Sequence, residues 1–290
     1  MTEMYTHRYV KTNGITLHVV TAGPEDGKPV LLLHGFPEFW YGWHHQIDYL
    51  ADNGFRVIVP DQRGYNISDK PRGRMAYHID ELTKDVLGLI DAFGYEKVYL
   101  AGHDWGAAVA WWVAAHHPDR LHKLVILNVP FPTIMRQAAE NRNWRQLGRS
   151  WYIYFFQLPF LPELVLRWSA KSSRNLLSAS SRRGTFTDED LAHYRQAWLV
   201  PGAATGMINW YRAALPAMLK TAVPEPGSIV VPTLMLWGER DVALGKELAQ
   251  PSIELCAEGR LIFFPKATHW VQHDEVDAVN EALAAFFGEE

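Results

Sequence analysis

The stretch Gly102-His103-Asp104-Trp105-Gly106 places one carboxylate between two glycines, at the end of an apolar run. In such a pattern a strand turns sharply into a helix and lifts the central side chain above the sheet, where it can act as a nucleophile. The Asp104 carboxyl, with a usual pKa near 3.9, is charged at neutral pH and needs no base to activate it. A carboxylate opens an ester poorly, because the product is a reactive anhydride, but it can displace a leaving group from saturated carbon. The alternative is that Asp104 only caps the following helix.

Two later residues fit the same chemistry. Asp241 follows the apolar run "LMLWG", and His269 follows "LIFFPKAT". The order nucleophile, acid, histidine is one of the chain orders in which a catalytic triad occurs. If Asp104 attacks a saturated carbon, the product is an ester on the protein. Water activated by His269, held in its tautomer by Asp241, would then hydrolyse that ester. Taken singly, Asp241 and His269 are equally consistent with turn, cap or solvated positions.

Alternating strands and helices must position these residues. Continuous apolar runs in "PVLLLHGFP", "FRVIVPD", "VYLAG" and "LVILNVP" are typical of parallel strands covered on both faces. Helical spacing appears at 79–93, which ends before Gly94, and at 106–116. Near the start, Asn13-Gly14 predicts a two-residue hairpin turn. We therefore expect an α/β fold with a mostly parallel sheet flanked by helices.

The alternation of strands and helices is interrupted once. After about Pro130 the chain becomes rich in Trp, Tyr, Arg and Leu at helical spacing, and strand-like runs return only with "PTLMLWGERD". A closing helix is expected over 276–287. The sequence thus predicts a core at 1–130, an inserted helical cap at 131–226 and the rest of the core at 227–290. In the cap, Arg136, Arg142, Arg145 and Arg149 fall near helical spacing, which indicates a solvated helix face.

Composition narrows the class of partner. The 290 residues are 48% hydrophobic and 21% charged, with a net charge of -4, which favours a globular protein and gives no electrostatic case for nucleic acid or an acidic membrane surface. Cys256 is the single cysteine, so no internal disulfide is possible, and no run approaches the length of a membrane span. We expect a cytoplasmic protein that acts on a small molecule without metal or cofactor, as a monomer or homodimer.

Six short stretches together resemble one known family. They are "HGFPE" (34–38), "DQRGYNISDKP" (61–71), "GHDWG" (102–106), "INWYRA" (208–213), "WGERD" (237–241) and "ATHW" (267–270). This set, which spans about residues 30 to 275, resembles the soluble epoxide hydrolases of the α/β-hydrolase superfamily. The resemblance implies an α/β-hydrolase fold with a cap and the conversion of an apolar epoxide and water to a vicinal diol.

The resemblance also implies roles for individual residues. Cap tyrosines Tyr152 and Tyr211 would donate hydrogen bonds to the epoxide oxygen, although neighbouring Tyr154 competes with Tyr152 for this role. The backbone N–H groups of Phe36 and Trp105 would form an oxyanion hole.

The loop that carries Phe36 is implied to contribute to the site as well. His34 would support this loop. His34, Pro37 and Trp105 would contact the substrate, and the Phe36-Pro37 bond would be cis.

Three other readings remain open at this point. Haloalkane dehalogenases share the Asp-Trp pair, but one branch has Asn at the position of Phe36 and the other takes a second Trp from its cap. Here the cap offers Trp144, Trp151, Trp168, Trp198 and Trp210. Fluoroacetate dehalogenases are more distant, because they carry Arg at the position of Trp105. A non-catalytic protein that keeps the fold to bind a ligand is the third reading.

Overall fold

The computed structural model describes residues 5–171, 176–218 and 225–289. In this part of the chain, eight strands form one sheet in the order β1-β2-β4-β3-β5-β6-β7-β8. The strands are β1 Thr6–Thr12, β2 Ile15–Ala22, β3 Lys28–Leu33, β4 Phe55–Pro60, β5 Val98–His103, β6 Leu121–Leu127, β7 Thr233–Gly238 and β8 Gly259–Phe264.

The sheet is parallel from β4 to β8 and antiparallel at the β1-β2-β4 edge. The expected α/β fold with a mostly parallel sheet is confirmed. The predicted hairpin turn joins β1 to β2, with φ of 44° at Asn13 and 74° at Gly14. Parallel pairing brings the carboxyl ends of β5, β7 and β8 to one edge, which is where the three triad candidates follow their strands.

Helices connect the strands. The α-helices are α1 His44–Asp52, α2 Ile79–Ala92, α3 Trp105–His116, α4 Pro132–Glu140, α5 Trp144–Arg149, α6 Trp151–Phe155, α7 Leu161–Lys171, α8 Leu176–Ser180, α9 Asp188–Leu199, α10 Ala203–Met218, α11 Ala249–Ile253, α12 Val271–Asp274 and α13 Val276–Gly288. Short 3-10 helices are η1 Trp40–Trp43, η2 Arg74–Tyr77, η3 Pro118–Arg120 and η4 Lys246–Leu248. None of these described helices has both the length and the apolar composition to cross a bilayer.

Two apolar layers cover the sheet. Successive side chains of a strand point to opposite faces, so Leu31 and Leu33 pack with helices α2 and α3, whereas Val30 and Leu32 pack with α1 and α13. This arrangement explains why the central strands β3 to β7 are unbroken apolar runs in the sequence: both faces of the sheet are buried there. The central strands therefore hold the turn at Asp104 on a rigid support.

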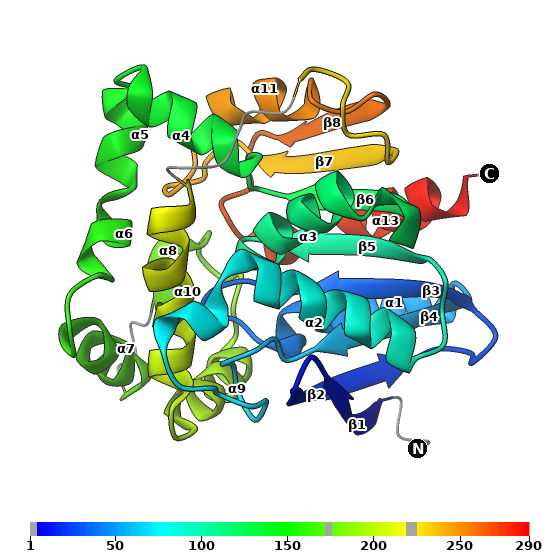
Figure 1. Ribbon diagram of the computed structural model, residues 1–290, viewed down its shortest axis with the longest axis horizontal. Coiled ribbons are helices and arrows are strands. Elements are labelled where there is room, and N and C mark those ends of the chain that lie inside the picture. The colour runs from blue at the N-terminus through cyan, green and yellow to red at the C-terminus, as the bar shows by residue number, and fades with distance from the viewer. Residues whose placement is uncertain (1–4, 172–175, 219–224, 290) are drawn as a thin grey trace.

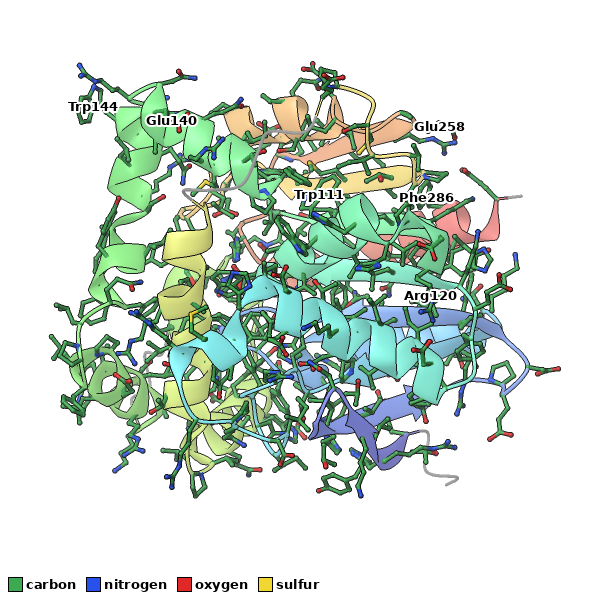
Figure 2. All side chains as sticks on the ribbon, in the orientation of Figure 1. Trp111, Arg120, Glu140, Trp144, Glu258 and Phe286 are labelled. Atoms are coloured by element: carbon green, nitrogen blue, oxygen red, sulfur yellow. The ribbon has the colours of Figure 1, made fainter. Side chains whose placement is uncertain are left out.

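Helices α4 to α10 lie between β6 and β7 in the chain, and Figure 1 shows them gathered at one end of the sheet. Helix α4 begins at Pro132, next to the predicted start of the cap. The last described residue of α10 is Met218, and residues 219–224 lie outside the described part. Trp144 projects outward from α5 (Figure 2). The division of the chain into core, cap and core stays a prediction.

Candidate active site

Asp104 occupies a sharp turn between β5 and α3. Its φ of 49° lies in the left-handed region, which is costly for a residue with a side chain. The flanking glycines make the turn possible: a Cβ on Gly106 would lie 2.1 Å from the Leu33 carbonyl oxygen, and one on Gly102 would lie 2.5 Å from the Gly106 carbonyl oxygen. Trp105 opens α3, so its N–H has no acceptor within the helix. The turn thus presents a carboxylate and a neighbouring backbone donor together.

The three triad candidates meet. His269 Nδ1 lies 2.6 Å from Asp241 Oδ2, and His269 Nε2 lies 3.3 Å from Asp104 Oδ2. The imidazole therefore bridges two carboxylates that are 137 residues apart in the chain. This geometry lets Asp241 fix the tautomer of His269 and turns Nε2 toward Asp104.

A residue that the sequence analysis missed supports Asp241. Asn128 follows β6 with φ of 54°, donates from Nδ2 to Asp241 Oδ2 over 2.9 Å and accepts from the Gly238 N–H over 2.8 Å. The Ala243 and Leu244 N–H groups donate to Asp241 Oδ1 over 2.7 and 2.8 Å. These bonds satisfy both oxygens of a buried carboxylate and fix its position. An Asn directly after an apolar run of strand length was the available signal in the sequence.

The loop after β3 closes over Asp104. The Phe36 N–H donates to Asp104 Oδ1 over 2.7 Å, and a Cβ on Gly35 would lie 2.2 Å from Asp104 Cβ. The Phe36-Pro37 peptide bond is cis. Because Phe36 N–H already contacts one oxygen of the carboxylate, it is placed to hold charge that develops on that oxygen.

His34 and Pro37 lie at the base of this loop. His34 is fully buried: Nε2 accepts from the Gln62 N–H over 3.0 Å, and Nδ1 donates to the Gly35 carbonyl over 3.1 Å. Burial lowers the pKa of His34, which favours the neutral ring that these contacts need. The Pro37 carbonyl accepts from the Trp198 indole. Both residues thus brace the loop, whereas Trp105 is the member of the predicted substrate-contacting set that lines the pocket described below.

Asp104 and His269 each stabilise the charged form of the other. Burial disfavours ionised Asp104, but the hydrogen bond and charge of His269, with the nearby His103 and the Phe36 N–H, outweigh it and lower the Asp104 pKa. Burial likewise opposes charge on His269, yet Asp241 and Asp104 raise the His269 pKa to about 10. Asp104 is consequently held in the anionic form that a nucleophile requires.

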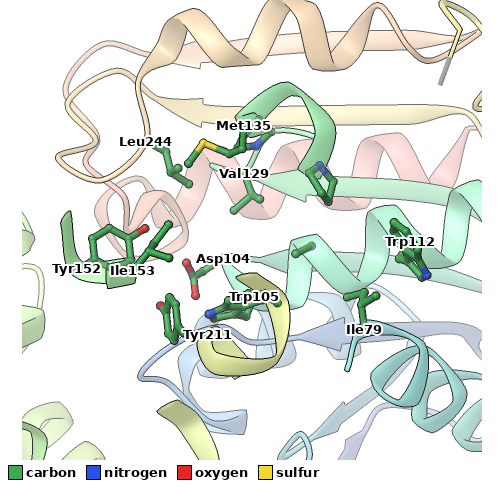
Figure 3. A pocket seen from close by; sticks show the side chains of 14 residues that line it. Ile79, Asp104, Trp105, Trp112, Val129, Met135, Tyr152, Ile153, Tyr211 and Leu244 are labelled. Carbon is green, nitrogen blue, oxygen red and sulfur yellow. The ribbon is translucent and has the colours of Figure 1, made fainter. Parts of the chain in front are cut away.

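A cavity of about 120 Å³ opens over Asp104 (Figure 3). This volume is far above the roughly 10–15 Å³ that one water requires, so it admits a small organic molecule. The walls are almost wholly apolar, and Asp104 is their one ionised group. They are formed by Ile79, Trp105, Ala108, Trp112, Val129, Pro130, Pro132, Met135, Tyr152, Ile153, Tyr211, Ala214 and Leu244.

Two tyrosines lie on the same side of Asp104 in this cavity (Figure 3). The rings of Tyr152 and Tyr211 meet edge to face with centroids 5.9 Å apart, and Tyr211 packs edge to face on Trp105 at 4.9 Å. Burial, and then the charge of Asp104, raise the pKa of both hydroxyls above the usual value, so both remain donors at neutral pH. Tyr154 is 61% exposed and is not among the residues that line this cavity, which favours Tyr152 as the partner of Tyr211.

A second group missed in the sequence lies beneath the triad and centres on buried Glu38. Its Oε1 accepts from the Tyr194 hydroxyl and from His273 Nε2, each over 2.8 Å. Its Oε2 lies 3.0 Å from His103 Nδ1 and 3.1 Å from Gln272 Nε2. His103 Nε2 in turn lies 2.8 Å from the His269 carbonyl oxygen. The group therefore ties the loop after β3 to the backbone of His269.

No metal centre is apparent among the residues that the structure describes: no three His, Cys, Asp or Glu side chains are grouped to hold an ion.

Comparisons with known proteins identify the family of this chain. The profile of the alpha/beta hydrolase fold matches residues 28–276. The AB hydrolase superfamily protein YfhM of Bacillus subtilis is 46% identical over 96% of both chains. Epoxide hydrolase 2 of Caenorhabditis elegans is 37% identical, over 99% of this chain and 81% of its own. The crystal structure of epoxide hydrolase A from Mycobacterium thermoresistibile superimposes with a TM-score of 0.84 at 34% identity, over 97% of this chain and 98% of that one. The chain thus belongs to the α/β-hydrolase fold family and, within it, to the epoxide hydrolases.

Proposed function

We propose that this protein hydrolyses an apolar epoxide to a vicinal diol through an ester on Asp104. The observation that carries the proposal is the pair of tyrosine hydroxyls beside the one ionised group of an otherwise apolar cavity. An ionised carboxylate supplies a nucleophile for saturated carbon, and the tyrosines supply protons for the oxygen that leaves it.

In the first step, Asp104 Oδ2 attacks one epoxide carbon and the bond from that carbon to the ring oxygen breaks. Oδ1, which accepts from the Phe36 N–H, becomes the ester carbonyl oxygen. The ring oxygen takes a proton from Tyr152 or Tyr211 as it becomes an alkoxide. Stabilising this oxygen is necessary because an unprotonated alkoxide is a poor leaving group in an apolar cavity.

In the second step, His269 takes a proton from water and the resulting hydroxide adds to the Asp104 carbonyl carbon. The charge on Oδ1 is stabilised by the N–H groups of Phe36 and Trp105. Collapse of this intermediate breaks the ester bond, and the departing alkoxide takes the proton from His269. The products are the diol and an Asp104 carboxylic acid. The proton of this acid passes to the tyrosinate left by the first step, which restores the Asp104 carboxylate and the tyrosine hydroxyl, so the oxygen and proton counts balance.

The tryptophans argue against haloalkane dehalogenation. A halide needs a second N–H donor beside Trp105, but Trp144, Trp151 and Trp168 are between 64% and 72% exposed. The Trp198 and Trp210 indoles donate instead to the carbonyls of Pro37 and Arg63. Every candidate donor of the helical segment is thus turned to solvent or already engaged, and the two tyrosines favour an oxygen leaving group.

The test is mass spectrometry of His269→Gln after exposure to styrene oxide and, separately, to 1-bromobutane. We expect an adduct on the Asp104 peptide that keeps the whole mass of the epoxide, because the ester forms but is not hydrolysed. Asp104→Asn is the matched control and should give no adduct. An adduct from the bromide alone, with bromide released, would instead make the protein a dehalogenase.

Single turnover of the unmodified protein in H₂¹⁸O separates the ester route from direct attack by water. The ester route places ¹⁸O in Asp104 and leaves the first diol unlabelled. Label that appears directly in the diol would contradict the ester. Epoxide that binds without any diol forming would favour the non-catalytic reading.

A further inference from the structure

Helix α7 carries apolar side chains on its outer face. Leu161, Leu164, Val165 and Trp168 recur at the spacing that normally faces a core, yet they are 46%, 60%, 37% and 71% exposed. The inner side of α7 is supplied by other residues, Pro162, Leu166, Ser169 and Ala170. The helix is therefore apolar toward the protein and apolar toward the outside.

Phe160, just before α7, strengthens this observation. It is 79% exposed, the highest value for a large apolar side chain in the described residues. Its φ of 61° is a conformation that favours Gly or Asn and is unusual for a bulky residue. Packing within the protein offers little to offset that cost, because most of the ring faces solvent.

Helix α6 shows the same division. Tyr152 lines the cavity over Asp104, whereas Trp151 and Tyr154 are 64% and 61% exposed. Figure 1 shows α5, α6 and α7 following one another along the side of the helical segment away from the sheet. We call Trp151, Phe160, Leu161, Leu164, Val165 and Trp168 the outer apolar face. The helix that lines the cavity also contributes to this face.

Basic side chains accompany the outer apolar face. Residues 131–171 hold six Lys and Arg against two Glu, in a chain whose net charge is -4. Both glutamates are already paired, Glu140 with Arg136 at 3.3 Å and Glu163 with Arg212 at 2.6 Å. On α7 itself, Arg167 and Lys171 are exposed beside the apolar side chains. The net charge of segment 131–171 is thus opposite in sign to that of the whole chain.

From this combination we infer that the outer apolar face docks on an anionic phospholipid surface. Exposed Trp and Phe side chains next to Lys and Arg are the features of helices that lie in a membrane interface. A second copy of the chain fits less well, because a two-fold contact on this face would bring Arg167 and Lys171 close to their own counterparts. The net charge of the whole chain gives no reason to expect binding to an anionic surface. The uneven distribution of charge along the chain does give such a reason.

The test is cosedimentation of the full chain with vesicles, which is measured without substrate and does not depend on the proposed reaction. Vesicles of phosphatidylcholine are compared with vesicles that contain about one-third phosphatidylglycerol. We expect binding to the anionic vesicles, weakened by salt, and little binding to the neutral ones.

Variants locate the contact. Phe160→Asn and Trp168→Ser should each weaken binding roughly ten- to hundredfold, the factor that corresponds to burial of one large apolar side chain. Asn suits the φ of residue 160, so this variant is expected to fold. Arg167→Glu should weaken binding to the anionic vesicles and leave the slight binding to the neutral vesicles unchanged. Val230→Ser is the matched control, because Val230 is 61% exposed and lies outside the helical segment.

Three results would overturn the inference. One is unmodified protein that stays in the supernatant with anionic vesicles. Another is equal loss of binding in Val230→Ser and Phe160→Asn. The third is a dimer in sedimentation equilibrium that Phe160→Asn abolishes while vesicles are not bound, since a second copy would then be the occupant.

Discussion

Replacing Glu38 by Gln should destabilise the protein strongly while keeping the shape of the side chain. Each oxygen of the Glu38 carboxylate has two polar neighbours, and the side chain is 1% exposed. In Gln one oxygen becomes an NH₂ group, so either orientation turns a donor toward two of these neighbours. At about 1.5–3 kcal/mol for each charge-assisted bond, the expected loss of unfolding free energy is about 3–6 kcal/mol.

Urea unfolding followed by far-UV circular dichroism at pH 7 measures this loss. Glu25→Gln is the matched control: its side chain is 86% exposed and lies 3.8 Å from Arg8, so we expect a change within about 0.5 kcal/mol. A Glu38→Gln variant as stable as Glu25→Gln would refute the reasoning, because the buried contacts would then contribute nothing.

The acid limb of the stability curve provides a second check on Glu38. Burial would raise the pKa of Glu38, but His273 and His103 outweigh burial and hold it well below the usual 4.5. A carboxylate with a lowered folded pKa contributes stability above its unfolded pKa and loses it as pH falls toward the folded value. The difference between the unmodified protein and Glu38→Gln should therefore shrink below about pH 4.5. A constant difference across this range would contradict the assigned charge.

Three further outcomes are expected. Gly106→Ala should lower the free energy of unfolding, measured in urea, by at least about 1–3 kcal/mol, because the added Cβ would lie 2.1 Å from the Leu33 carbonyl oxygen. The gain in helix propensity from Ala is smaller than this loss. An unchanged urea midpoint would contradict the geometry of the turn. The raised pKa of His269 stabilises the fold fully below its unfolded value of 6.5, and this contribution should be lost as pH rises toward about 10. His269→Gln should abolish this loss of stability at high pH. An equal dependence of stability on pH in the variant and in the unmodified protein would contradict the prediction. Tyr152→Phe should reduce the rate of diol formation about 10²- to 10⁴-fold, the usual range for loss of a positioned acid, whereas exposed Tyr154→Phe should leave it unchanged; equal effects would remove the distinction between them.

Local sequence patterns predicted the strands and the turn at Asp104, because these features depend mainly on residues that are close together in the chain. The apolar runs of β3 to β7 became largely buried strands because both faces of the sheet are covered there, whereas the apolar run of β8 forms an edge strand whose residues are mostly exposed. Gly102 and Gly106 marked the turn at Asp104 because no Cβ fits at either position. Boundaries were less accurate. Strand β6 begins at Leu121, three residues before the apolar run that predicted it, because His122 and Lys123 lie in the sheet's exposed margin, where polar side chains are tolerated.

The supporting residues could not be predicted in the same way, because they depend on contacts between distant segments. Glu38 meets Tyr194 and His273, which are 156 and 235 residues away. Asn128 reaches Asp241 across 113 residues. No spacing rule connects such positions. The choice between Tyr152 and Tyr154 likewise required the direction of each side chain on α6, because residues two apart on a helix face different sides.

The charges around His269 give the proposed reaction its order. In the free protein two carboxylates flank the imidazole, at 2.6 and 3.3 Å, and both raise its pKa. Once Asp104 becomes a neutral ester, one of these charges is gone, so the pKa of His269 must fall and the ring more readily releases its proton, which leaves the neutral form that can accept a proton from water. The charge on Asp104 that makes it a nucleophile is therefore the same charge whose loss turns His269 into a base. Asp241, held by Asn128 and two backbone N–H groups, stays in place through both steps to orient the ring.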